Sequence, residues 1–302
     1  MNIKGIKQLG GTSGNTFMIR TGKKDYVLKL YSKKDLNKVK YQMDILKKLN
    51  MEGRITIDPI NDEPLRVGGK VGFIYEFVDG KHYRELRIKN KLLRFSQFVG
   101  RFSKVASRIG LNRMGGDRWV RHETRIFTQW AKKLDKRNDR YYQNLSKLIK
   151  SGLPLVEKDL NGKTFRTQVI HGDLHHDNVI YDKKSGLLLI IDTDGLEEGI
   201  LAREILVPIS YELTSSPSKN KKIITESLKG YESETKLTRK EKEAIPALML
   251  LRKFGEIVWL IMQNENGNIT NDLSKRAMAG TVKQLRIVLS QYENLKKDCL
   301  AN

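Results

Sequence analysis

The first eighty residues alternate short apolar segments with turns that are rich in glycine and lysine. Short apolar runs bounded by such turns are typical of β-strands, and the expected strands are residues 6–9, 16–21, 26–31 and 71–77. Between the third and fourth of these, residues 34–50 repeat apolar side chains at the spacing of a helix face. We therefore expect residues 1–80 to form a small β-rich lobe with one helix.

From about residue 82 the apolar positions follow a mainly helical period. One stripe covers 95–109, a second helical stretch covers roughly 119–150, and the chain reads as helical again from 201 to the end. A polar break is expected at 214–221. Short apolar, β-like runs interrupt the helices at residues 168–170, 179–181 and 187–191. Residues 81–302 are thus expected to form a larger helical lobe, which makes the predicted fold class α+β with two lobes.

The composition and the charge of the chain exclude several classes of protein. The chain has 302 residues, a single cysteine (Cys299) and a formal net charge of +22. One cysteine excludes a disulfide framework and a multi-cysteine zinc site. No apolar run approaches the roughly 20 residues that span a bilayer, so we expect a soluble protein without a transmembrane segment, in a reducing compartment. The charge favours anionic partners, although a lysine-rich solvated surface explains an evenly spread charge equally well.

The most informative segment is Val169-Ile170-His171-Gly172-Asp173-Leu174-His175-His176-Asp177-Asn178-Val179, followed by Ile190-Ile191-Asp192-Thr193-Asp194. Its carboxylates and its amide stand in loops where apolar runs end or begin. Phosphoryl transfer requires such groups, because a base accepts the proton of the attacking hydroxyl and oxygen ligands hold Mg²⁺. A polar loop that merely caps a core strand is the simpler reading, but it does not account for the ordered set.

This segment resembles the aminoglycoside phosphotransferase and choline kinase family, which has a protein-kinase-like fold. The resemblance implies that Asp173 is the catalytic base and that Asn178 and Asp192 are Mg²⁺ ligands. It also implies that His171 braces the loop and that His175 is structural. Asp194 stands where family members have an acidic residue. Two roles remain open for it, contact with the metal or orientation of the loop.

The N-terminal lobe fits the same resemblance. A glycine-rich turn between the first two strands allows backbone N–H groups to approach nucleotide phosphates, with Gly11, Ser13 and Gly14 as candidates. Lys29 lies among apolar neighbours on a strand that resembles the kinase strand whose lysine contacts phosphates. A lysine there is costly unless it is paired. The segment around Glu76 and Val78 resembles the inter-lobe hinge, whose backbone would meet adenine.

The chain departs from the family pattern in two places. Gln42 stands where a helix glutamate normally pairs with the strand lysine, so Asp44 substitutes for it, or the alignment register is wrong, or Gln42 itself holds Lys29. Glu204 stands near the position of an aspartate that braces the catalytic segment. It either takes that role or forms an exposed helix pair with Arg203.

A basic stretch covers residues 81–113. It has ten lysines and arginines against Glu85 alone, counting Lys81, Arg84, Arg87, Lys89, Lys91, Arg94, Arg101, Lys104, Arg108 and Arg113. A face that docks an anionic surface and an ordinary solvated helix face both fit this pattern. The turn before Trp119 loosely resembles a spore-coat-associated kinase-like subgroup of the family.

These observations lead to one prediction and one alternative. The prediction is a Mg-ATP-dependent kinase that transfers the γ-phosphoryl group to a hydroxyl of a small molecule, with ATP and Mg²⁺ as cofactors. The alternative is a weakly or non-catalytic kinase-like module that docks on a spore coat, cell-wall polymer or similar anionic surface. We expect a monomer, cytoplasmic or spore-associated, that does not read nucleic-acid sequence.

Overall fold

The computed structural model describes residues 2–9, 15–110, 113–267 and 271–301. The chain divides into two compact units. The first comprises Met1–Lys89, Val105–Gly110 and Asp173–Glu197, and the second comprises Asn90–Lys104, Leu111–Gly172 and Glu198–Asn302. The predicted α+β class is confirmed. Our boundary between residues 80 and 81 stays a prediction.

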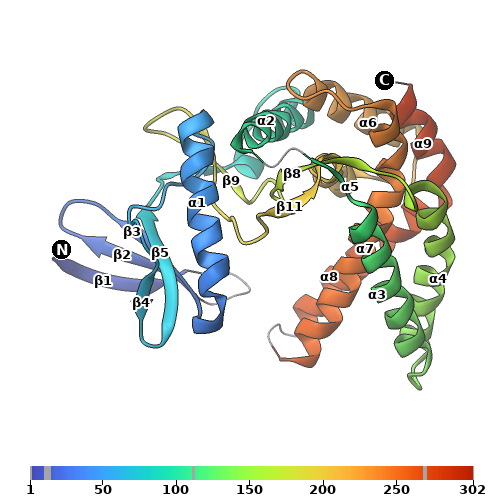
Figure 1. The fold of residues 1–302 in the computed structure, drawn as a ribbon, viewed down its shortest axis with the longest axis horizontal. Helices are drawn as coiled ribbons and strands as arrows, with labels where there is room; N and C mark the ends of the chain where they lie inside the picture. Colours follow the sequence, from blue (N-terminus) through green and yellow to red (C-terminus); the bar gives the residue numbers. More distant parts are fainter. Residues whose placement is uncertain (1, 10–14, 111–112, 268–270, 302) are drawn as a thin grey trace. The chain divides into compact units, whose positions relative to one another are not determined.

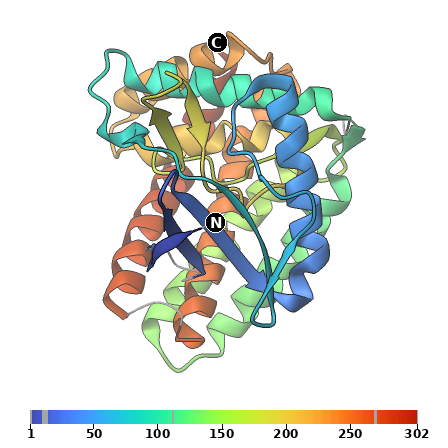
Figure 2. The same ribbon diagram turned by 90° about the vertical axis from the view of Figure 1, so that its left-hand side faces the viewer.

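The first unit contains a five-stranded antiparallel sheet in the order β1-β2-β3-β5-β4. Its strands are β1 (Ile3–Gln8), β2 (Thr16–Thr21), β3 (Tyr26–Ser32), β4 (Leu65–Val67) and β5 (Lys70–Glu76). Helix α1 (Leu36–Gly53) packs against β3 and β5, as Figure 1 shows, and Figure 2 turns the blue strands and this blue helix toward the viewer. The buried side chains of α1 repeat at helical spacing, as predicted, and they include Gln42.

A second sheet in the first unit carries the loops of interest. Its strand order is β10-β9-β6, with β6 at Gly80–His82, β9 at Val179–Asp182 and β10 at Leu188–Ile190. The apolar runs at 179–181 and 187–191 are therefore strands, as expected. Residues 83–85 and 107–109 form short 3₁₀ helices. We did not predict β4 or β6, which are three-residue strands without an apolar run.

The second unit is mainly helical. Its helices are α2 (Lys91–Ala106, whose last two residues belong to the first unit), α3 (Asp117–Asp135), α4 (Arg140–Leu160), α5 (Leu206–Glu212), α6 (Pro217–Glu232), α7 (Arg239–Glu265), α8 (Asn271–Ser290) and α9 (Tyr292–Leu300). A three-stranded sheet in the order β11-β8-β7 completes it, with β7 at Arg113–Gly115, β8 at Phe165–Ile170 and β11 at Glu197–Ile200, whose first residue belongs to the first unit. Figure 1 shows α3, α4, α7 and α8 running alongside one another. Within the described part of the chain, no helix is both long and apolar enough to cross a membrane.

Two boundaries differ from the sequence prediction. The stretch 119–150, expected as one helical segment, is two helices, because α3 ends at Asp135 and Asp139 begins α4 by accepting a hydrogen bond from the backbone N–H of Tyr141 at 2.7 Å. The polar break expected at 214–221 is shorter, because Pro217 begins α6. A capping side chain fixes the first of these helix boundaries, and a proline at the first helical position fixes the second.

Candidate active site

Lys29 lies in the middle of β3 and is 5% exposed. Its Nζ atom is 2.8 Å from Oδ1 of Asp192 and 2.8 Å from Oδ1 of Asp194. Burial by itself lowers the pKa of this ammonium, but the two carboxylates outweigh burial and raise the pKa above its ordinary value. The expectation that this lysine requires a charged partner is met by two partners, and Lys29 stays protonated at neutral pH.

The two aspartates stand in the loop that follows β10. Asp192 accepts a hydrogen bond from the backbone N–H of Asp194 at 3.2 Å, and Asp194 accepts one from the hydroxyl of Tyr31 at 2.6 Å. Burial, and then the charge of Asp194, raises the pKa of Tyr31, so this hydroxyl remains a donor. Asp194 thus orients Lys29 and is itself oriented by Tyr31. We did not identify Tyr31 as a site residue, although it shares a strand face with Lys29.

Asp173 and Asn178 belong to one tight turn that leads into β9. The side-chain Nδ2 of Asn178 donates to the backbone oxygen of Asp173 at 2.9 Å, and the N–H of Asn178 donates to the oxygen of His175 at 2.9 Å. The Asp173 carboxylate is half-exposed, with Oδ2 3.6 Å from Nε2 of His175. The turn fixes the main chain at Asp173 while leaving its carboxylate accessible.

The pairing of β9 with β10 brings the turn and the aspartate loop together. Val179 lies opposite Ile190, and the backbone oxygen of Asn178 accepts the N–H of Ile191 at 3.0 Å. Asn178 and Asp192 therefore occupy neighbouring strand ends in the first unit. Carboxylate and amide oxygens are the ligands that Mg²⁺ takes in nucleotide sites, so the chemistry of this donor set fits that ion.

The segment before Asp173 is held within the second unit. Glu204, which is 1% exposed, accepts the backbone N–H of His171 at 2.6 Å and that of Gly172 at 2.9 Å. Arg252 of α7 donates from Nη1 to the backbone oxygen of Gly172. Of the two roles left open for Glu204, the structure shows the bracing one. Arg252 has no motif around it and was not identified from the sequence.

Gln42 does not hold Lys29. Its side chain is fully buried and donates from Nε2 to the backbone oxygen of Thr193 at 3.1 Å, while Asp44 pairs with Lys48 at 2.7 Å on an exposed helix surface. Neither residue supplies the partner that we sought in α1. Lys29 is paired with Asp192 and Asp194 instead, and Gln42 positions the loop between these two residues.

The remaining sequence candidates lie at the end of β5 and in the glycine-rich turn. Glu76 pairs with Lys24 at 2.8 Å, and the N–H of Phe77 donates to the backbone oxygen of Asp25 at 2.9 Å. The Phe77 amide is therefore used within the first unit, and Val78 follows it, half-buried. Gly11, Ser13 and Gly14 lie outside the described residues, and the nucleotide roles proposed for all of these positions stay predictions.

All three histidines of the motif make side-chain contacts, and the ring of His171 lies edge-on to Phe102 with centroids 6.3 Å apart. The ring of His176 stacks on Tyr83 with centroids 5.4 Å apart, and Nδ1 of His175 accepts the N–H of Asp177 at 3.2 Å. These contacts fit the structural role that we expected for His175. Among the described residues, no group of three or more His, Cys, Asp or Glu side chains is placed to hold a metal ion by itself.

A paired lysine on a sheet, followed by an Asp–Asn turn and an aspartate loop, defines a kinase-like phosphotransfer fold. Comparison with protein families gives the same class, since the phosphotransferase enzyme family model matches residues 5–205. The chain belongs to this family. Among curated proteins no match was found.

Solved structures share the fold at low sequence identity. A choline kinase, LicA, from Streptococcus pneumoniae is 17% identical with a TM-score of 0.66, and the match covers 95% of this chain and 94% of that one. The amicoumacin kinase hAmiN, in complex with AMP-PNP, Ca²⁺ and its ligand Ami, is 15% identical with a TM-score of 0.66, over 93% and 88% of the two chains. Spectinomycin phosphotransferase APH(9)-Ia, in complex with ADP and spectinomycin, is 12% identical with a TM-score of 0.68, over 96% and 94%.

Proposed function

We propose that this protein is an ATP- and Mg²⁺-dependent kinase that transfers the γ-phosphoryl group to a hydroxyl of a small molecule. The observation that carries the proposal is the arrangement in the first unit, where Lys29 faces Asp192 while Asn178 and Asp192 occupy neighbouring strand ends. Matched structures that hold AMP-PNP or ADP support the choice of nucleotide. Mg²⁺ supplies charge neutralisation of the phosphates when it is bound.

Each role is assigned to a particular atom. The half-exposed carboxylate of Asp173 accepts the proton of the attacking hydroxyl. The protonated Nζ of Lys29 donates to phosphate oxygens, and oxygen atoms of Asn178 and Asp192 hold the cation. The glycine-rich turn and the backbone from Glu76 to Val78 bind the remaining phosphates and the adenine. The acceptor is an alcohol, and the names of the matched structures, a choline kinase, an aminopropanol kinase and a spectinomycin phosphotransferase, suggest the first compounds to test.

The test uses phosphorus NMR of ATP and Mg²⁺ mixed with the protein and a deproteinised metabolite extract, and then with choline, aminopropanol and spectinomycin singly. We expect a new phosphomonoester signal, and we expect Asp173→Asn to slow its formation by at least about 100-fold, the contribution of a general base. Asp177→Asn is the control, because Asp177 lies in the same turn and pairs with Arg84 at 2.9 Å. Product formation by Asp173→Asn at the wild-type rate would show that the assignment of the base is wrong.

The alternative, a docking module without turnover, has one supporting observation. The exposed face of α2 and the residues after it carry Arg94, Arg101, Lys104 and Arg108 at helical spacing, although Lys104 pairs with Glu234 and Arg108 with Glu52. Salt-sensitive binding of inorganic polyphosphate, with no phosphorylated product in the NMR assay, would favour this function. The alternative was also suggested by Gln42, the neutral residue where a glutamate was expected to pair with Lys29. Asp192 and Asp194 pair with Lys29 instead, so Gln42 no longer supports the alternative.

A further inference from the structure

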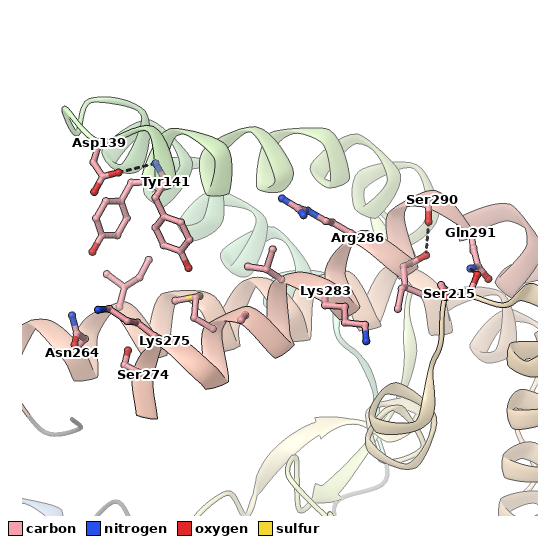
Figure 3. Close-up of a pocket in the computed structure, with 16 residues that line it drawn as sticks. Asp139, Tyr141, Ser215, Asn264, Ser274, Lys275, Lys283, Arg286, Ser290 and Gln291 are labelled. Carbon is pink, nitrogen blue, oxygen red and sulfur yellow. Dashed lines mark hydrogen bonds between the residues drawn. The ribbon is translucent and has the colours of Figure 1, made fainter. Parts of the chain in front are cut away.

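A groove in the second unit lies between α4 and α8, and no role in the proposed phosphotransfer involves it. Its volume is ≈ 960 Å³, at the upper end of the range of about 300 to 1,000 Å³ that small-molecule sites occupy. Figure 3 shows Tyr141 and Arg286 reaching into the same space between these helices.

The body of the groove is apolar and aromatic. Ile261 of α7 and Met278 and Val282 of α8 line its floor, and Tyr141 and Tyr142 of α4 line its wall. The two tyrosine rings meet edge to face at 5.7 Å, and the guanidinium of Arg137 lies 4.3 Å from the centre of the Tyr142 ring. These contacts hold the wall in place, so the apolar body of a ligand meets a prepared surface.

The charges that line the groove are mostly positive. Lys275, Lys283 and Arg286 line it, and within the described part of the chain no ion pair joins any of these three to a carboxylate. The single carboxylate among the lining residues is Asp139, whose Oδ1 is occupied by the N–H of Tyr141. Lys283 and Arg286 lie one helical turn apart on α8. Figure 3 shows Arg286 directed toward α4 and Lys283 directed away from it, so the flexible lysine stem has to turn for both side chains to reach one ligand group. Ser290 and Gln291 line the groove beyond them, so this end is polar as well as cationic.

The groove uses a face of α8 that is distinct from the one directed at α5 and the middle of α7. Thr281 donates to Glu256 at 3.3 Å, and Gln284 donates to the backbone oxygen of Tyr211 at 3.4 Å. At 100° per residue, Thr281 and Gln284 point roughly opposite to Arg286. Substitutions in the groove therefore leave those contacts in place.

We propose that this groove binds an anionic amphiphile of small-molecule size, with an acyl or aryl body between the apolar floor and the tyrosine-lined wall and a phosphate or carboxylate between Lys283 and Arg286. Lys275 and Arg286 lie about 16 Å apart along the helix at ~1.5 Å per residue, room for a medium-length chain. The guanidinium of Arg286 offers a planar fork to two oxygens of one head group. The inference is independent of the proposed phosphotransfer.

The test is isothermal titration with dodecyl phosphate below its micelle concentration. We expect binding at one molecule per chain, weakened at least about tenfold by Lys283→Glu with Arg286→Glu. Arg276→Glu is the matched control, because Arg276 is exposed on the same helix and does not line the groove, and its effect stays within about twofold. Val282→Trp fills the floor and weakens binding with every charge retained.

Several results would overturn the proposal. Equal binding of dodecyltrimethylammonium would show that the head-group charge is not recognised, and equal binding of inorganic phosphate would show that the apolar floor contributes nothing. An equal loss in Arg276→Glu would assign the binding to the overall charge of +22. Binding to phosphatidylglycerol vesicles without binding of monomeric dodecyl phosphate would replace the small molecule by a membrane surface. The circular dichroism spectrum and the thermal midpoint of each variant confirm that it is folded.

Discussion

Glu204 makes the unfolding free energy of this protein depend on pH, and the contacts of its side chain give the direction of the effect. The carboxyl is buried, its Oε1 accepts two backbone N–H groups, and its Oε2 has no hydrogen-bond partner among the described residues. Burial raises its pKa from 4.5 to about 7, although the two N–H groups work in the opposite direction. The charges of Arg203 and Arg252 also lower this pKa, but burial outweighs them, so folding favours the protonated carboxyl relative to the unfolded chain.

The sign and size of the effect follow from this shift. The stability that the group contributes is complete below pH 4.5 and is lost as the pH rises through about 7. A shift of that size corresponds to about 3 kcal/mol of unfolding free energy, most of it lost between pH 5 and 8. Glu204→Gln keeps an oxygen for the two N–H groups and cannot ionise, so its stability lacks this dependence.

The assay is urea unfolding of wild type and Glu204→Gln at pH 5, 6, 7 and 8. We expect the difference in unfolding free energy to move in favour of the variant as the pH rises. Glu241→Gln is the control, because Glu241 is equally buried but its pKa is lowered by Arg166 and the cap of α7, against the effect of burial. Its contribution is lost only as the pH falls below 4.5, so that difference stays flat over this range. A flat difference for Glu204→Gln as well would refute the reasoning.

Two further predictions concern packing and the lysine site. Gly152→Ala places a Cβ 2.7 Å from the ring of Phe254 and is expected to lower the unfolding free energy by about 1–3 kcal/mol. Gly280→Ala, whose Cβ has no atom within 4 Å, is expected to stabilise α8 by up to about 1 kcal/mol. Urea midpoints that fall by the same amount in both variants, or that fall in neither, would contradict this prediction. Tyr31→Phe removes a hydroxyl bonded to a carboxylate and is expected to lower the unfolding free energy by about 1.5–3 kcal/mol, and an unchanged urea midpoint would show that Asp194 does not depend on it.

The sequence predicted the helices and strands correctly where the pattern of apolar residues matches the buried positions of the structure. The strand at Thr16–Thr21 was predicted at its observed bounds, because a buried strand between turns shows both its apolar run and its ends. The separation of α3 from α4 was not predicted, because Lys136–Asn138 is as polar as an exposed helix surface. Asp139 was the available signal, as an N-cap residue ahead of a helical pattern.

The candidate site was predictable in its residues and less so in its contacts. The spacing of Asp173, Asn178 and Asp192 along the chain indicates residues for proton transfer and metal binding. The hairpin of β9 and β10 brings Asn178 and Asp192 to neighbouring strand ends, and Asn178 contacts the backbone of Asp173. The partners of Lys29 lie 163 and 165 positions away in the chain, and no local pattern encodes such a pairing. Only the packing of α1 shows that Gln42 reaches the loop at Thr193 and not the lysine.

The sharing of one lysine by two aspartates sets the electrical balance of the proposed nucleotide site. Lys29 contributes +1 and Asp192 with Asp194 contributes −2, so these three side chains sum to −1, which repels a triphosphate and attracts a divalent cation. With the cation the same cluster sums to +1. For the proposed function, cation and nucleotide are thermodynamically coupled ligands, each tightening the binding of the other by the same factor.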